Sequence, residues 1–90
     1  MTHASRLGDT VVHPGCGTAE IATASPNVFI NNIKAARKGD STTPHCPDMH
    51  VGHLAGTRNV YVNGRDLQGI GDPVDCGATI TGGSPNVFIP

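Results

Sequence analysis

The hexapeptide Ser25-Pro26-Asn27-Val28-Phe29-Ile30 returns unchanged at residues 84–89, and a related stretch, Thr57-Arg58-Asn59-Val60-Tyr61-Val62, lies between the two copies. In the two identical copies, turn-forming residues precede β-branched and aromatic residues. This order is typical of a turn that leads into a short strand. Three copies along one chain predict three similar lobes, each built around such a strand.

A second repeat supports the division into three lobes. The dipeptide Gly-Asp occurs at residues 8–9, 39–40 and 71–72, at nearly equal intervals. Because the three aspartates occupy the same position of the repeat, we expect their carboxylates to cap turns rather than to bind a metal. Asn63-Gly64 predicts the tight turn of a hairpin in the middle lobe.

The composition favours an all-β fold with a thin core. The chain has 90 residues, of which 37% are hydrophobic, with 12 Gly, 7 Pro and no Trp. Gly or Pro interrupts nearly every window long enough for a helix, and residues 33–38 are the one doubtful stretch. Because so small a chain buries little surface, we expect a single domain over residues 1–90 that needs a metal, a disulfide or a partner chain for stability.

Charge and hydropathy argue against several classes of protein. The formal net charge is −1 and the basic residues form no cluster, so a nucleic-acid partner is not expected. The N-terminal residues lack the apolar stretch of a signal peptide, and no apolar run approaches the ~20 residues of a membrane span. We therefore expect synthesis in the cytoplasm without a signal peptide, and export only by a dedicated machine.

Histidine and cysteine gather in the extra loop length of the first two lobes. Zinc prefers four ligands drawn from imidazole and thiolate, and a structural zinc would stabilise a domain with a thin core. The spacing matches no zinc finger, and each loop histidine has solvation as an alternative role. His3 is expected in a frayed terminus, and His53 suits packing as well as ligation. The candidate ligands are His13 and Cys16 in the first lobe, His45, Cys46, His50 and His53 in the second, and Cys76 in the third.

The three cysteines are expected to be unpaired. An odd number cannot all pair within one chain and a cytoplasmic origin disfavours disulfides, so a Cys16–Cys46 bridge is the minor alternative. Cys76 stands before Gly77, where the chain must turn tightly, and is the best thiolate candidate. Cys16 and Cys46 are expected to act as small buried hydrophobic residues.

Several motifs together resemble the PAAR-repeat family. Residues 30–40, Ile-Asn-Asn-Ile-Lys-Ala-Ala-Arg-Lys-Gly-Asp, are similar to the family motif Val-Phe-Ile-Asn-Gly-Lys-Pro-Ala-Ala-Arg-x-Gly-Asp. Lys34 stands where the namesake proline usually does, and residues 66–70 replace the second Pro-Ala-Ala-Arg-x segment, so both departures concern turn geometry. The later stretches that are similar to the family are residues 60–65, 71–77 and 83–89.

The resemblance implies the tip of a type VI secretion system or of a contractile phage tail. Such a tip is a small cone of three pseudo-symmetric lobes that pierces membranes and carries a zinc near its apex. Its base sits, as one copy per trimer, on a trimeric β-helical spike (VgrG or a phage central spike). A lone chain would be a monomer without enzymatic activity, and would be secreted or held in the virion tail. Some family members carry fused toxic domains. Because Met1 and Pro90 lie close to the first and last motifs, any effector of this chain is expected to be a separate chain. The target membrane would be met only transiently.

The family's metal is held by three histidines and one cysteine. By position, the resemblance assigns these roles to His13, His45, His50 and Cys76, with His53 and Cys16 as substitutes. Iron fits the same ligand set as zinc.

The most β-prone segment of each lobe is expected to form the base that meets the spike. Three similar strand edges match the three equivalent edges of a trimeric partner. The predicted contact residues are Val28, Phe29 and Ile30, then Val60, Tyr61 and Val62, then Val87, Phe88 and Ile89.

Two other functions compete with this interpretation. A zinc-dependent hydrolase would need an open coordination position and a base such as Asp48 or Glu20. A free-standing zinc-binding adaptor would not need the three-fold repeat.

Overall fold

The computed structural model describes residues 2–46, 49–58 and 60–89, so Asp48 and Asn59 lie outside the described residues. The described chain consists of short strands, bridges and turns without a helix, which confirms the all-β prediction. In that part of the chain no helix has the length and hydrophobicity needed to cross a membrane. The doubtful stretch at residues 33–38 begins as a strand. The strands are β1 (Thr2–His3), β2 (Thr10–His13), β3 (Gly17–Glu20), β4 (Phe29–Ile30), β5 (Ile33–Lys34), β6 (Tyr61–Val62), β7 (Arg65–Asp66), β8 (Thr79–Ile80) and β9 (Phe88–Ile89).

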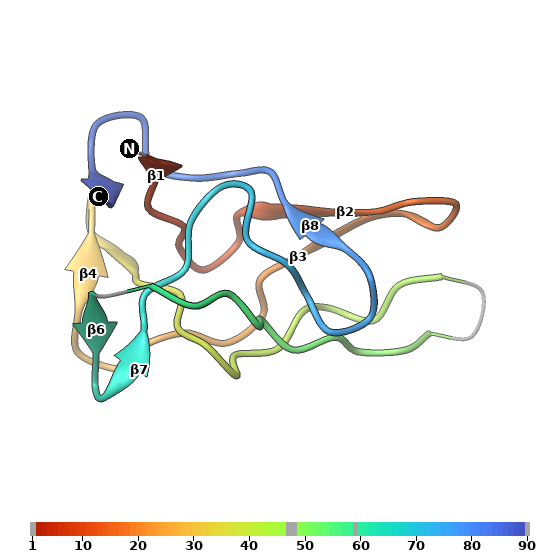
Figure 1. Ribbon diagram of the computed structural model, residues 1–90, viewed down its shortest axis with the longest axis horizontal. Helices are drawn as coiled ribbons and strands as arrows, with labels where there is room; N and C mark the ends of the chain where they lie inside the picture. Colours follow the sequence, from red (N-terminus) through yellow and green to blue (C-terminus); the bar gives the residue numbers. More distant parts are fainter. Residues whose placement is uncertain (1, 47–48, 59, 90) are drawn as a thin grey trace.

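The strands form four small antiparallel sheets at two ends of an elongated body. Three sheets have two strands each, β1-β9, β4-β5 and β6-β7, and the fourth has the order β3-β2-β8. The body measures 33 by 24 by 21 Å. Figure 1 shows the two-stranded sheets at the broader left end, which we call the base. The β2-β3 hairpin and the second loop, described over residues 43–46 and 49–50, extend to the opposite end, which we call the tip.

The three sheets of the base are equivalent. Two are hairpins whose turns, Asn31-Asn32 and Asn63-Gly64, have positive φ at both residues, as a type I′ turn requires. The turn predicted at Asn63-Gly64 is therefore confirmed. In the third sheet β1 pairs with β9, with Thr2 opposite Ile89. The N-terminal residues thus complete the third lobe, and the expectation that His3 lies in a frayed terminus is wrong.

One hydrogen bond recurs in each sheet of the base. In each sheet, the donor is the backbone N–H of the residue that directly follows β5, β7 or β1. The acceptor is the carbonyl of the residue that directly precedes the paired strand β4, β6 or β9. These bonds are Ala35 N to Val28 O at 2.9 Å, Leu67 N to Val60 O at 2.8 Å, and Ala4 N to Val87 O at 2.9 Å. The three lobes predicted from the repeats therefore share one backbone arrangement.

A ring of backbone hydrogen bonds joins the lobes in the interior. Ser5 N–H donates to Gln68 O at 2.9 Å, and Gln68 N–H donates to Ala36 O at 3.1 Å. Ala36 N–H closes the ring by donating to Ser5 O at 3.0 Å. All three residues are fully buried, so loss of one lobe would leave backbone groups of the others unpaired. The lobes therefore stabilise one another.

The three repeated aspartates cap turns, as predicted. Each side chain accepts a hydrogen bond from the backbone N–H of the residue three positions earlier, which satisfies a donor that the turn leaves free. The bonds are Arg6 N to Asp9 Oδ2 at 2.7 Å, Arg37 N to Asp40 Oδ2 at 2.8 Å, and Gly69 N to Asp72 Oδ2 at 2.8 Å.

Arginines pair with these aspartates. Arg37 contacts Asp40 at 3.0 Å, and in the third lobe, where Gly69 takes the place of an arginine, Arg58 contacts Asp72 at 2.7 Å. The hydrogen bond to Asp40 raises the pKa of Arg37; burial lowers this pKa, and the attraction between the two charges raises it further. The pKa of Arg58 is raised in the same way by Asp72. A raised pKa gives stability that is lost only as the pH rises through it, here in the strongly alkaline range. These pairs therefore add no pH dependence near neutrality.

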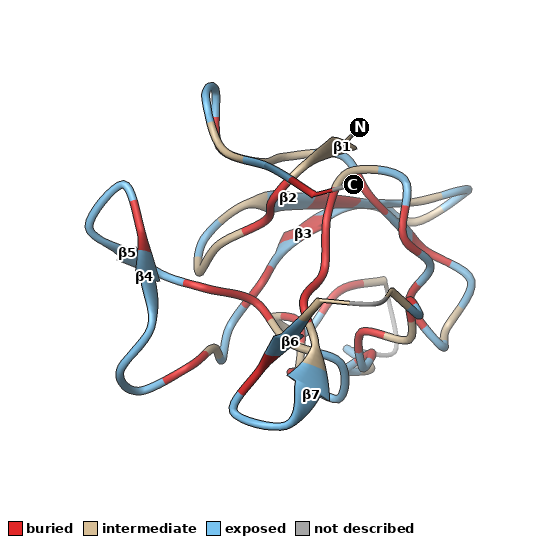
Figure 2. Ribbon diagram, turned by 60° about the vertical axis from the view of Figure 1, so that its left-hand side comes forward, coloured by how far each residue is buried: buried red, intermediate tan, exposed pale blue. Residues whose placement is uncertain are grey.

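The core consists of two small aliphatic clusters, in agreement with the thin core predicted. In Figure 2 the buried segments run through the interior, and exposed residues occur in β4, β5, β6 and β7 at the base. The cluster behind the base contains Ala4, Ile30, Ala35, Val62, Leu67 and Ile89. The other cluster contains Val11, Ile21, Ala36, Leu54, Val74, Ala78 and Ile80, with Cys76 packed against it.

Candidate metal centre

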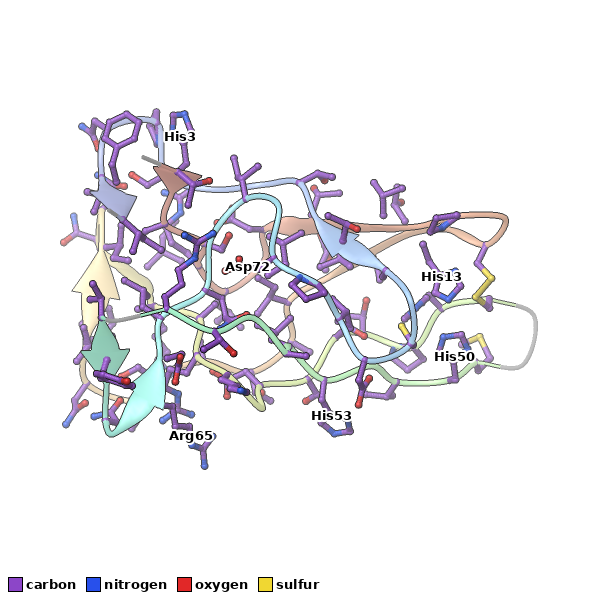
Figure 3. All side chains as sticks on the ribbon, in the orientation of Figure 1. His3, His13, His50, His53, Arg65 and Asp72 are labelled. Atoms are coloured by element: carbon purple, nitrogen blue, oxygen red, sulfur yellow. A yellow bond between two sulfur atoms is a disulfide. The ribbon has the colours of Figure 1, made fainter. Side chains whose placement is uncertain are left out.

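The two extended loops bring three histidines together at the tip. His13 is the last residue of β2, where the chain turns toward β3. His45 and His50 face each other across the second loop, with His45 N–H donating to His50 O at 3.0 Å. Figure 3 shows His13 and His50 at the tip and His3 at the opposite end. The extra loop length noted in the sequence therefore converges in one place.

The three imidazole rings surround a common point. The ring centres of His45 and His50 lie 4.3 Å apart, and that of His13 lies 5.3 Å from each of them. One potential ligand atom from each histidine, together with Cys46 Sγ, lies within 4.8 Å of the others. Donors at this spacing can share a single ion. The tip thus contains a His/Cys cluster that could hold a metal ion.

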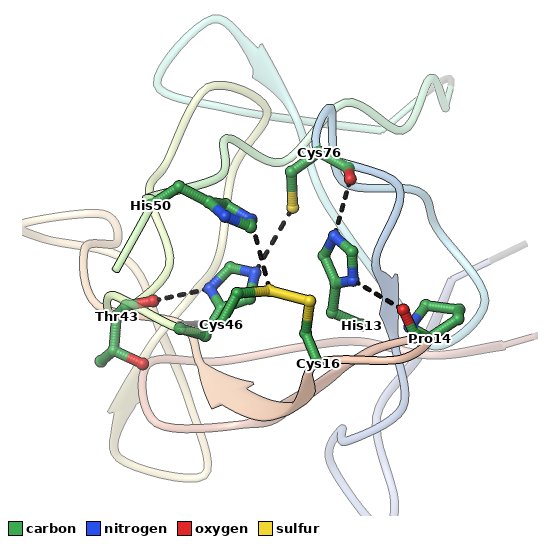
Figure 4. The surroundings of a disulfide bond; sticks show 8 residues. His13, Pro14, Cys16, Thr43, Cys46, His50 and Cys76 are labelled. Carbon is green, nitrogen blue, oxygen red and sulfur yellow. Dashed lines mark hydrogen bonds between the residues drawn. A yellow bond between two sulfur atoms is a disulfide. The ribbon is translucent and has the colours of Figure 1, made fainter. Parts of the chain in front are cut away.

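Cys76 reaches the same cluster from the third lobe (Figure 4). Its Sγ lies 3.5 Å from His45 Nε2, and its carbonyl oxygen lies 2.8 Å from His13 Nε2. The turn is closed by a hydrogen bond from Gly77 N to Val74 O, with Gly77 at a φ of 98°. The tight turn predicted at Gly77 is therefore confirmed, and it brings a free thiol to the histidines.

A hydrogen bond orients His45 for ligation, and both ring nitrogens of His13 lie near carbonyl oxygens. His45 Nδ1 lies 3.0 Å from Thr43 O, and because a carbonyl only accepts, Nδ1 must carry the proton. The lone pair of His45 then lies on Nε2, the nitrogen that faces Cys76 Sγ. His13 lies near two carbonyls, Pro14 O at 3.1 Å and Cys76 O at 2.8 Å. A neutral imidazole can donate to only one of them, so in this structure the lone pair of the other ring nitrogen faces a carbonyl oxygen.

One histidine of the cluster is buried, and the other members are partly exposed. His45 is buried, with 5% of its surface exposed, whereas His13, His50 and Cys76 are of intermediate burial. An ion could therefore enter from solvent and bind against a buried imidazole.

Cys16 and Cys46 form a disulfide, so the expectation that both are unpaired is wrong. Their Cα atoms lie 4.6 Å apart although 30 residues separate them in the sequence. Cys16 lies in the β2-β3 turn and Cys46 at the end of the second loop, and both are of intermediate burial rather than core residues. The two sulfurs come within bonding distance because the ends of both loops converge on one cluster. The cytoplasmic origin and the odd number of cysteines, on which the expectation rested, do not indicate this convergence.

The remaining histidines lie outside the cluster. The His53 side chain is 56% exposed on the flank of the body, with Nδ1 3.5 Å from Asp75 Oδ2. His3 lies at the base, where Nδ1 donates to Ser84 O at 2.6 Å and the ring packs 4.5 Å from Phe88. Glu20, proposed as a hydrolytic base, is exposed at the end of β3.

Gly52 leaves room for the side chain of Cys76, a close approach that the sequence did not indicate. A Cβ at this position would lie 2.8 Å from Cys76 Sγ and 2.5 Å from Val74 Cγ1. Gly52→Ala is therefore expected to cost about 1–3 kcal/mol of unfolding free energy and to weaken metal binding, because Cys76 must move. Thermal unfolding and metal titration measure the two effects.

Gly56→Ala is the matched control for this prediction. Its Cβ would lie 2.6 Å from Asp72 Cγ and from Gln68 Oε1, away from the tip. Gly56→Ala should lose similar stability but keep the metal affinity of the wild type. Equal metal affinities in the two variants would contradict the role assigned to Gly52.

Comparison with known proteins identifies relatives of this chain. The family model described as PAAR motif matches residues 7–82. The double-stranded DNA deaminase toxin A of Burkholderia cenocepacia is 35% identical over 74 residues, which cover 79% of this chain and 5% of that protein. An NAD(P)(+) glycohydrolase toxin and a (p)ppApp synthetase toxin of Pseudomonas aeruginosa are each 31% identical over 81 residues, which cover 80% of this chain and 19% and 18% of those proteins. The chain therefore spans less than a fifth of the length of these curated relatives.

Proposed function

This chain belongs to the PAAR motif family, and on that premise we propose that it is the membrane-piercing tip that caps a trimeric β-helical spike (VgrG or a phage central spike). One copy sits on each trimer, with its base against the spike and its metal centre at the far end. The observation that carries this proposal is the set of three equivalent sheets at the base, each with an exposed aromatic side chain.

The aromatic residues supply an apolar surface for docking. The exposed fractions are 53% for Phe29, 61% for Tyr61 and 43% for Phe88. Successive side chains of a strand point to opposite faces of the sheet. The residue after each aromatic residue packs into the core, so the aromatic side chain itself points away from the core. Those next residues are Ile30, Val62 and Ile89, all buried. Each sheet has only two strands, so its edges could accept a further strand from a partner.

The cross-strand neighbours of the aromatic residues argue for an apolar contact with the spike. Phe29 lies opposite Lys34, Tyr61 opposite Asp66, and Phe88 opposite His3. A three-fold symmetric spike offers the same residue to all three positions. A charged residue there that attracted Lys34 would repel Asp66, so charge complementarity cannot hold at all three. We therefore expect the spike to dock through apolar side chains and backbone hydrogen bonds, with little dependence on salt.

For the metal, we propose that one zinc ion is held by His13, His45, His50 and Cys76. Together these side chains link all three lobes, and three imidazoles with one thiolate complete a tetrahedral site, which iron would also fit. Because the four ligands lie in different lobes, a bound ion would cross-link the lobes. Because four protein ligands leave no open coordination position for a substrate, we propose that the ion is structural and that this chain is not an enzyme. In the described residues the cluster contains no carboxylate that could act as a hydrolytic base.

The toxins among the relatives suggest what the tip delivers. The matched region is a small part of each toxin, so we attribute the activities in their names to the other parts of those proteins. For this chain we expect an effector-carrying role and a secreted or tail-tip location.

Light scattering of the chain mixed with a trimeric β-helical spike tests the capping role. One chain per spike trimer is expected, with a monomer when the chain is alone. Three chains per trimer, or no complex with any spike of a contractile system, would refute the proposal.

A further inference from the structure

The disulfide joins the two loops that carry the three histidines. Cys16 lies in the turn that begins at His13, whose carbonyl accepts the Cys16 N–H at 3.0 Å. Cys46 directly follows His45. The carbonyl of Cys46 accepts a hydrogen bond at 3.0 Å from the N–H of Met49, the residue before His50. The S–S bond therefore spans the same gap between the first and second lobes that a shared metal ion would span.

Backbone pairing between these loops lies at their stems. Thr43 N–H donates to Glu20 O at 2.8 Å, and Ile21 forms a bridge with Thr42. Beyond the stems, the disulfide connects the ends of the loops (Figure 4). With this bond open, the two ends could separate without breaking the pairing at the stems. His13 would then move relative to His45 and His50.

The disulfide also determines which thiols are available. Cys46 Sγ lies 3.9 Å from His50 Nε2 and belongs to the cluster, but as a disulfide sulfur it is not a thiolate ligand. Cys76 is the free cysteine. In the oxidised chain the donors are therefore three imidazoles and the Cys76 thiol, which is already a full tetrahedral set.

We propose that the Cys16–Cys46 disulfide and the metal centre are coupled, so that a closed disulfide strengthens metal binding and a bound metal protects the disulfide from reduction. This rests on the part of the proposed function that assigns the metal to the three histidines and Cys76. The closed disulfide holds His13 against His45 and His50 before the ion arrives, so binding needs less ordering of the loops. Reciprocity is required, because a coupling free energy acts equally on both equilibria.

The redox step has a defined balance. A dithiol reductant such as dithiothreitol passes two electrons and two protons to the S–S bond, which becomes the thiols of Cys16 and Cys46, and the reductant becomes a cyclic disulfide. If reduction weakens zinc binding tenfold, saturating zinc must lower the midpoint potential of the disulfide by about 30 mV. A tip assembled in a reducing compartment and released into an oxidising one would then hold its metal more tightly after release.

The test compares zinc affinity in the two redox states of the wild-type chain. Competition with a chromophoric chelator gives the dissociation constant for zinc, first with the disulfide closed and then after reduction with excess dithiothreitol removed under anaerobic conditions. We expect zinc binding to be at least about tenfold weaker after reduction. A redox titration with and without zinc should show the matching shift of about 30 mV. Equal affinities, or tighter binding by the reduced chain, would overturn the coupling.

Serine variants separate ordering of the loops from the extra thiols. Cys16→Ser/Cys46→Ser has neither the disulfide nor the two added sulfur ligands, and it should bind zinc as weakly as the reduced wild type. If this double variant binds zinc as tightly as the oxidised wild type, the coupling is wrong. Cys76→Ser tests the ligand set separately, because it should weaken zinc binding in both redox states. Failure of the chain to dock on a spike would leave all these measurements unaffected.

Discussion

Removal of zinc by a chelator is expected to lower the melting temperature of this chain by about 15–30 °C. The proposed ligands come from all three lobes, and a metal that binds only the folded state stabilises it by mass action. Zinc at a thousand times its dissociation constant contributes about 4 kcal/mol. For a domain of this size each kcal/mol corresponds to about 4–8 °C. Circular dichroism during heating, with and without chelator, measures the difference, and metal analysis should return one zinc per chain.

Two histidine variants control the chelation experiment. His45→Ala removes the buried imidazole of the cluster and should make the melting temperature insensitive to zinc and to chelator. His53→Ala changes an exposed histidine outside the cluster and should respond to chelator as the wild type does. If the metal-free wild type melts within a degree or two of the zinc-bound form, the metal does not stabilise the fold.

Replacement of Phe29 or Phe88 by aspartate is expected to weaken docking on the spike at least about thirtyfold. An aromatic anchor at the centre of an interface typically contributes 2 kcal/mol or more, and a buried carboxylate adds a desolvation penalty. Both rings are substantially exposed in the free chain, so the folded state should tolerate the change. Isothermal titration calorimetry with the spike measures affinity, and unchanged melting temperatures establish that the variants are folded.

Lys34→Glu is the matched control, because it reverses a charge directly opposite Phe29. If docking is apolar, this variant should change the dissociation constant by no more than about threefold, and added salt should have a similarly small effect. Exposed Lys38 should tolerate substitution equally well. A loss of affinity with Lys34→Glu as large as with Phe29→Asp would show that the contact is electrostatic and that the apolar docking surface is wrong.

The prediction of three lobes succeeded because it depended on short segments. A turn at Asn63-Gly64 or a capping contact between Arg37 N–H and Asp40 is made by residues a few positions apart. Such contacts form wherever the local residues favour them, so repeated motifs predict repeated structure. The convergence of His13, His45 and His50 was also foreseeable, because equivalent loops of a three-fold repeat leave the body at the same end.

The two errors concern pairings between distant residues. His3 has no local signal for a strand, and it becomes ordered only because β9 returns to pair with β1. The Cys16–Cys46 disulfide likewise depends on two loop ends that the sequence does not relate. Expectations from terminal position and from cellular compartment were general tendencies, and tertiary contacts overrode both.

Local sequence patterns alone predict the all-β class, the three lobes, their capped turns and the residue types available for a metal. The tertiary structure decided how the lobes close on one another through the buried ring of Ser5, Ala36 and Gln68. It also decided that Cys16 pairs with Cys46 while the Cys76 thiol stays free beside His45. The physical reason is that turns and strands follow from interactions between near neighbours, whereas a disulfide, a shared ligand set and a docking face require distances of a few ångströms between residues far apart in the chain.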